Sequence, residues 1–99
     1  MKSVPHQLVT IICEPILAKP MITLIRSLGA SGFTMTEVQG EGSGNRHSGE
    51  IPDLKTKIEV LASSAVAQTV MQKVAEQFFE DYSVIVYATG ATVLRAEKF

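Results

Sequence analysis

A strand-like segment that runs into a long glycine-rich loop limits how this chain can fold. Residues 33–38 (FTMTEV) are rich in β-branched and apolar residues, which predicts a strand. Residues 55–61 (KTKIEVL) alternate, with Thr56, Ile58 and Val60 on one face, which is the period of a half-buried strand. Residues 40–54 have no regular pattern, so we expect the two strands to form one long hairpin.

The loop of this hairpin has the composition of an anion-binding segment. Four of the seven glycines of the chain lie in it, at Gly40, Gly42, Gly44 and Gly49. Glycine allows close approach of the backbone to a ligand, and free N–H groups in such a loop can form a concavity for an anion. Arg46 adds a planar, permanently charged group suited to phosphate or carboxylate. Loops beyond about 12–15 residues are often functional, so we expect an anionic small molecule here; the alternative is a solvated loop without a ligand.

The residues before the hairpin predict a strand and a helix. Residues 8–13 (LVTIIC) are short, apolar and β-branched, which indicates a buried strand that ends in a core thiol, Cys13. Pro20 is suited to the first position of a helix, and Gly29 or Gly32 is suited to its end. The apolar face of this helix consists of Met21, Leu24, Ile25 and Leu28.

A second helix and further strands are expected after the hairpin. Ser63 or Ser64 is a candidate N-cap. The inward stripe of the helix consists of Val66, Val70, Val74 and Phe78. Residues 84–88 (VIVYA) are apolar on both faces, which predicts a central or interfacial strand. We expect Gly90 to turn the chain and residues 92–94 to form a short fifth strand.

The element order is therefore β-α-β-β-α-β, which predicts an α+β, ferredoxin-like sandwich with two helices on one face of the sheet. The other face needs cover, and in a chain of 99 residues we expect oligomerisation to provide it. A net charge of −1 argues against nucleic acid as a partner. The single cysteine, the lack of a membrane-length apolar run and the lack of signal-peptide features lead us to expect a cytoplasmic protein.

Other kinds of site have weaker support. The G-x-G-x-G spacing does not open a helix, so a Rossmann site is not expected. His6 and His47 are too isolated for a metal cluster. Nothing pairs the carboxylates of the loop for acid–base catalysis. Arg95 is either a solvated side chain or a second phosphate contact.

The ordered motifs of the chain resemble those of PII signalling proteins. GFTMTEVQGEG at residues 32–42 is similar to the strand that enters their T-loop, and KTKIEVL to the strand on which the loop returns. ATVLR at residues 91–95 is similar to their last strand with its nucleotide-binding arginine. Within this superfamily, residues 40–49 and 78–87 resemble the PII-like proteins of inorganic-carbon metabolism, the SbtB and carboxysome-associated CPII types.

The resemblance implies one PII-like domain over residues 1–99, a T-loop at about residues 40–54, and a homotrimer with nucleotide in three clefts between subunits. The residues implied near the adenine or ribose are Gly32 and Thr34. Those implied around the phosphates are Gly40, Gly42, Ser43, Arg46 and Arg95. Those implied at the border of the cleft are Cys13, Leu61, Val84 and Ile85.

The departures from the PII pattern refine the expected ligand. Residues 81–84 (DYSV) replace a turn that carries a lysine in ATP-binding PII proteins, so AMP, ADP or cyclic AMP is expected rather than ATP. Gly44 replaces a glutamine that helps to bind 2-oxoglutarate. We therefore expect a regulatory sensor and not an enzyme, with bicarbonate as a candidate second ligand. A bicarbonate transporter or a carboxysome-linked protein is the candidate partner, placing the sensor in the cytoplasm, at the carboxysome or peripherally at the inner membrane.

Two other classes of function compete with this expectation. A small hydrolase of the acylphosphatase type shares the ferredoxin-like fold but needs an arginine-bearing loop after the first strand, and residues 13–17 (CEPIL) contain no arginine. A purely structural trimer is the other alternative, in which Arg46 would have no ligand.

Overall fold

Strands and helices follow one another along the chain in the predicted order. The structure is a computed structural model that describes residues 3–30, 32–41 and 53–94. Its elements are β1 (Val4–Cys13), η1 (Pro15–Leu17), α1 (Ala18–Ser27), β2 (Thr34–Gly40), β3 (Asp53–Ala62), α2 (Ser64–Phe78) and β4 (Ile85–Val93). The expected β-α-β-β-α-β order is confirmed. None of the helices described is long and apolar enough to cross a membrane.

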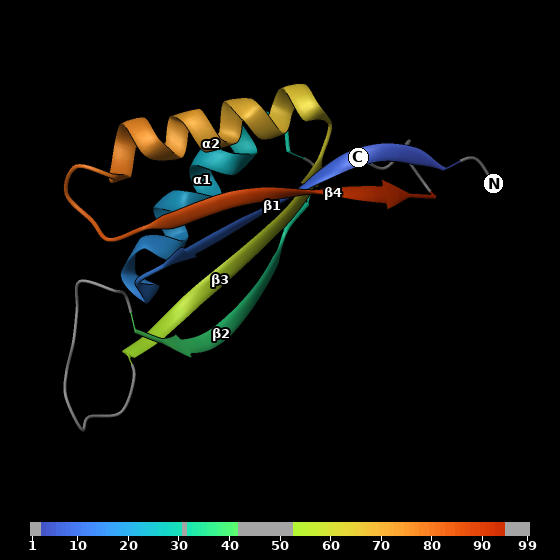
Figure 1. Cartoon of the computed structure of the whole chain (residues 1–99). Coiled ribbons are helices and arrows are strands. Elements are labelled where there is room, and N and C mark those ends of the chain that lie inside the picture. The colour runs from blue at the N-terminus through green and yellow to red at the C-terminus, as the bar shows by residue number, and fades with distance from the viewer. Residues whose placement is uncertain (1–2, 31, 42–52, 95–99) are drawn as a thin grey trace.

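The four strands form one antiparallel sheet in the order β2-β3-β1-β4. Both helices lie on the same face of this sheet, and β2 and β4 form its two edges (Figure 1). This is the ferredoxin-like arrangement that the sequence predicts. None of the described helices lies over its opposite face (Figure 1).

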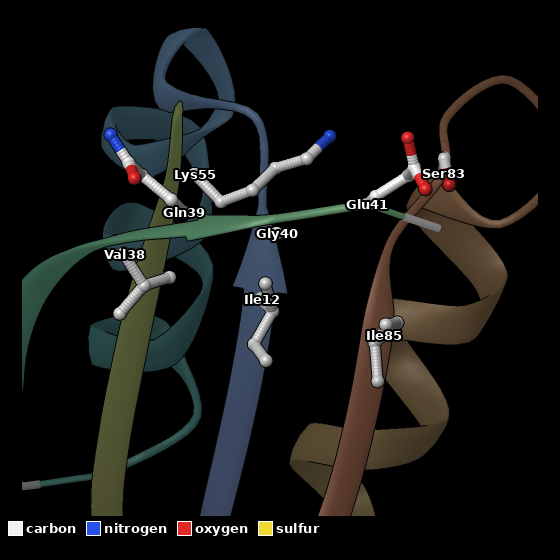
Figure 2. A pocket seen from close by; sticks show the side chains of 8 residues that line it. All are labelled: Ile12, Val38, Gln39, Gly40, Glu41, Lys55, Ser83 and Ile85. Carbon is white, nitrogen blue, oxygen red and sulfur yellow. The ribbon is translucent and has the colours of Figure 1, made fainter. Parts of the chain in front are cut away.

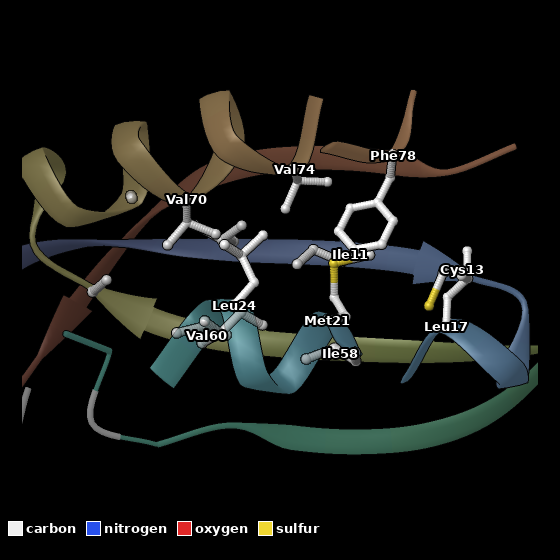
Figure 3. Packing of buried hydrophobic residues seen from close by; sticks show 14 residues of the cluster. Ile11, Cys13, Leu17, Met21, Leu24, Ile58, Val60, Val70, Val74 and Phe78 are labelled. Carbon is white, nitrogen blue, oxygen red and sulfur yellow. The ribbon is translucent and has the colours of Figure 1, made fainter. Parts of the chain in front are cut away.

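The core lies between the sheet and the helices. Side chains of α2, among them Val70, Val74 and Phe78, point toward β1, where Ile11 lies beneath them (Figure 3). Ile58 in β3 is fully buried in the same cluster, as its alternating pattern predicts. Burying one side chain of this size contributes roughly 1.5–3 kcal/mol, so this layer accounts for much of the stability of the fold.

The hairpin of β2 and β3 reaches further into the loop than expected. Gly40 pairs with Asp53 and Gln39 pairs with Leu54, so these residues lie in strands rather than in irregular loop. Strand β2 begins at Thr34, one residue later than predicted. The remaining loop, residues 42–52, lies outside the described residues.

The first helix starts earlier than Pro20. A 3₁₀ turn begins at Pro15 and leads directly into α1, in which Pro20 is the third residue. The amide groups of a first helical turn have no partner within the helix, so a proline there removes no hydrogen bond. The helix ends as predicted, with Gly29 just after it. Gly29 has a φ of 90°, a conformation that favours glycine.

The second helix follows its predicted cap. The N–H of Val66 donates to Ser63 Oγ at 3.3 Å, which closes the first turn of α2. Val70, Val74 and Phe78 are buried as expected. At the start of the helix the buried residue is Ala67, and Val66 is only partly buried.

The prediction of two strands around Gly90 is wrong. Strand β4 is continuous through Gly90, which pairs with Gln7, and through Thr92, which pairs with Pro5. Pairing with β1 keeps this segment extended, although glycine is commonly a turn residue. Strand β4 lies at an edge of the sheet, so of its two predicted places, central or interfacial, the central one is wrong and the interfacial one stays a prediction.

Candidate functional site

The helix-free face of the sheet carries the side chains that alternate with the core residues. We call it the open face. On β3 it includes Lys55, Lys57, Glu59 and Leu61. Ile85 and Tyr87 of β4 lie on the same face and are 51% and 43% exposed. Exposed apolar side chains that lie together on one face mark a candidate binding or assembly surface.

A first concavity on this face, which we call the loop hollow, lies where β2 and β1 end and β3 and β4 begin. Its lining residues are Ile12, Val38, Gln39, Gly40, Glu41, Lys55, Ser83 and Ile85. The antiparallel order brings these strand ends together, because the ends of β1 and β2 meet the starts of their neighbours. Its volume is about 160 Å³.

The loop hollow has an apolar floor and charged groups at its rim. Ile12 and Ile85 form part of the floor, and Lys55 extends from β3 over the end of β1 (Figure 2). Glu41, at the end of β2, and Ser83, before β4, line the other side. An ammonium group beside apolar walls is partly shielded from water, which strengthens its attraction for an anion. An anionic group in this hollow would be attracted by Lys55 and repelled by Glu41, against an apolar surface.

A second concavity, which we call the turn hollow, lies at the opposite end of β3, beside the connection from α1 to β2. Its lining residues are Leu8, Gly32, Phe33, Thr34, Glu59 and Leu61. Its volume is about 270 Å³. Lys55 and Leu61, one in each hollow, are separated by about 20 Å along the strand. The two hollows are therefore distinct places on one chain.

The structure divides the predicted site residues between these two hollows. Gly40 and Ile85 line the loop hollow. Gly32, Thr34 and Leu61 line the turn hollow. The predicted residues Gly42, Ser43, Arg46 and Arg95 lie outside the described residues.

Two predicted residues lie away from both hollows. Cys13 is fully buried in the core, and Ile12, its neighbour on the opposite face, lines the loop hollow in its place. Burial raises the pKa of the Cys13 thiol, and the nearby Glu14 carboxylate raises it further. Val84 is partly buried against the core cluster. The alternation of side chains along β1 explains the position of Cys13, because neighbours point to opposite faces. Val84 directly precedes β4.

Lys55 and Ser83 are functional candidates that the sequence-based site does not include. Lys55 could have been found from the alternation of β3, since it shares a face with Leu61, which is a predicted site residue. Ser83 lies in the turn where this sequence lacks the lysine of ATP-binding PII proteins. Among the described residues, no cluster of three histidine, cysteine or acidic side chains could hold a metal ion.

Comparison with known proteins gives a consistent result. Residues 6–98 match the family described as Nitrogen regulatory protein P-II. Among solved structures, a PII-like signaling protein from Thermus thermophilus is 35% identical, with a TM-score of 0.84, and the match covers 100% of this chain and 99% of that chain.

The chain is also similar to CPII from Thiomonas intermedia. The structure of CPII bound to ADP, AMP and acetate matches with a TM-score of 0.83 at 23% identity, covering 100% of this chain and 98% of that chain. The structure of CPII bound to ADP and bicarbonate matches with a TM-score of 0.85 at 24% identity, covering 99% of this chain and 97% of that chain. Likeness at this level of identity establishes the shared fold.

Proposed function

Because the chain belongs to the nitrogen regulatory protein P-II family, we propose that it is a PII-like regulatory sensor that binds an adenine nucleotide between the subunits of a homotrimer. In this proposal residues 1–99 form one PII-like domain, with a T-loop at about residues 40–54 whose ends are paired in β2 and β3. The sensor is not an enzyme. It relays energy or inorganic-carbon status to a partner through the loop.

The observation that carries this proposal is the pair of incomplete hollows on the open face. Their volumes of about 160 and 270 Å³ fall below the roughly 300–1,000 Å³ of typical ligand pockets. Each hollow has part of what a nucleotide needs: the loop hollow has Lys55 for phosphate, and the turn hollow has apolar walls at Leu8 and Phe33. If the loop hollow of one subunit meets the turn hollow of the next, a complete cleft is formed at each of three seams.

The open face supports the trimeric assembly. Ile85 and Tyr87 are exposed there, and an extensive apolar surface on a single chain favours association. A closed ring of three identical subunits brings a different part of each chain to every seam, because its contacts are head to tail. In such a contact the loop hollow of one subunit can meet the turn hollow of the next.

The ligand class follows from the similarity to CPII and from the charges of the loop hollow. CPII structures hold ADP, AMP and bicarbonate, and we transfer these ligands to this chain as candidates, with cyclic AMP as a further one. Lys55 is the one cationic side chain among the described residues that line the loop hollow, and Ser83 adds no charge. One or two phosphates are therefore favoured over three.

Bicarbonate is the proposed second ligand, and the loop hollow is its proposed location. The partner is a bicarbonate transporter or a carboxysome-linked protein, so the sensor works in the cytoplasm, at the carboxysome or at the inner membrane. If the loop contacts the partner differently with and without nucleotide, the partner must change nucleotide affinity by the same factor. The sensor works through this coupling between nucleotide affinity and partner affinity.

Titration calorimetry with AMP, ADP, cyclic AMP and ATP, each with and without bicarbonate, tests the proposal. GDP is the matched control for the base. We expect heat with AMP or ADP, one site per subunit, and weaker binding of ATP and GDP. No heat with any adenine nucleotide would refute the sensor. Sedimentation gives a separate test of the site between subunits. If the protein binds nucleotide as a single subunit, the site between subunits is refuted but nucleotide sensing is not.

A further inference from the structure

An arginine at the end of α1 lies over the aromatic ring that walls the turn hollow. The Arg26 guanidinium carbon is 5.5 Å from the centroid of the Phe33 ring, within the range of a cation–π interaction. Phe33 lines the turn hollow on one side and, together with Arg26, a groove along α1 on the other. The ring is thus the partition between the two concavities.

Arg26 holds the connection from α1 to β2 at both of its ends. Its backbone carbonyl accepts a hydrogen bond from Gly29 N–H at 3.2 Å, where the helix ends. Its side chain covers Phe33, the residue immediately before β2. Gly32 has no side chain to anchor it, and the ring of Phe33 is the anchor next to it along the chain. Ala30 also packs against the core and Thr34 pairs with Glu59, so the ring adds to contacts that already hold the two ends of this short segment.

We propose that Arg26 is a positioning residue for nucleotide binding, which it affects through Phe33 without touching the ligand. The proposal rests on the proposed function and on the family resemblance, which implies that Gly32 and Thr34 lie near the adenine or ribose. The guanidinium fixes the ring, the ring fixes the start of β2, and the start of β2 forms the edge of the turn hollow. Arg26 is exposed, so its removal disturbs this local geometry more than the core.

Two substitutions separate the charge from the length of this side chain. Arg26→Gln removes the cation and keeps a good helix former, whereas Arg26→Lys keeps a cation for the ring. Lys19→Gln is the matched control, because Lys19 lies in the same α1 groove, is exposed and loses the same charge. We expect Arg26→Gln to weaken AMP and ADP binding by about 2–5-fold, the size of an exposed cation–π contact. Arg26→Lys should retain most of the affinity, and Lys19→Gln all of it.

The pattern of losses distinguishes positioning from other roles. A positioning residue on the base side weakens AMP and ADP by the same factor, and the lost contact with the ring lowers the unfolding temperature by a few degrees relative to Lys19→Gln. A loss confined to ADP would mean that Arg26 contacts phosphate, and a fall in unfolding temperature with unchanged affinity would mean that it only supports the fold. Either result, or unchanged affinity, overturns the proposal.

Hydrogen exchange on the nucleotide-free protein tests the same inference without a ligand. Arg26→Gln should speed amide exchange at Gly32 and Thr34 by about 2–5-fold relative to Lys19→Gln, because the anchor on the ring is weakened. Equal rates in the two variants would overturn the positioning role. If the wild-type protein binds no nucleotide but the exchange rates differ as expected, the proposed function fails and the conformational role of Arg26 stands.

Discussion

Lys55 lies directly opposite Val38 in the β2–β3 pair, and both line the loop hollow at the base of the loop. If this ammonium group binds phosphate, replacing it should weaken nucleotide binding without harming the fold. We expect Lys55→Gln to lower ADP affinity by about 10–100-fold, since a hydrogen bond to a charged group contributes roughly 1.5–3 kcal/mol. Calorimetry measures the change.

The control for this variant lies two residues along the same strand. Lys57 shares the open face with Lys55 but is not among the residues that line the loop hollow. Lys57→Gln removes the same charge and should leave ADP affinity within about twofold of wild type. Equal losses in the two variants would mean that overall charge, and not contact in the hollow, attracts the ligand.

A cation placed at Ser83 should alter the preference for phosphate number. Ser83 lines the loop hollow opposite Lys55, so Ser83→Lys adds a second ammonium group there. We expect the affinity for ATP to rise relative to that for AMP by roughly tenfold, because the third phosphate gains a charged partner. Gln72→Lys, on the exposed side of α2, adds the same charge away from the hollow and should leave the ratio unchanged. An unchanged ratio in both variants would contradict the assignment of phosphate to this hollow.

The cap of α2 should contribute measurably to stability. Ser63→Ala removes the hydroxyl that accepts from Val66 N–H and should lower the free energy of unfolding by about 1 kcal/mol. Ser64→Ala, one residue later and inside the helix, should be neutral or slightly stabilising, because alanine is the better helix former. Urea unfolding of both variants checks the difference. Similar losses in the two would show that the Ser63 hydroxyl does not act as a cap.

The buried thiol should make stability depend on pH in the alkaline range. Burial raises the pKa of Cys13 above its ordinary value of 9.0, so the folded state holds the proton more tightly than the unfolded state. The stabilisation is complete below about pH 9 and is lost as the pH rises above it. Cys13→Ala should cost about 1 kcal/mol at pH 7 and should show a shallower fall in stability between about pH 9 and 10. Urea unfolding of the wild type and of Cys13→Ala at about pH 9 and 10 measures how steeply the stability of each falls with pH. An equal fall in the two proteins would contradict the prediction.

Short-range patterns were sufficient to predict most of the fold. The alternation of Thr56, Ile58 and Val60 predicts which face of β3 is buried, and Gly29 predicts where α1 ends, because both depend on local geometry. The continuity of β4 depends instead on pairing with β1. Gly90 has turn-like character by itself, and only its partner Gln7 explains why it stays in the strand.

The same division applies to the candidate site. Gly32, Thr34 and Leu61 lie together in the turn hollow, and their contact with a nucleotide stays a prediction. The alternation of β3 adds Lys55 to the open face. The approach of Ser83 to the end of β2 could not be read from the sequence, because it joins segments more than forty residues apart. Cys13 was assigned to the border of the cleft through a resemblance in sequence position, whereas the pleat of β1 directs its side chain into the core.

The open face of the sheet also makes the stability of the fold depend on the concentration of the protein. A lone subunit leaves Ile85 and Tyr87 in water, and the trimer that we propose would cover them. By mass action, the melting temperature of such an assembly rises with its concentration. A cell that makes only a little of this protein would therefore hold it in a more fragile form, and its abundance would set its lifetime.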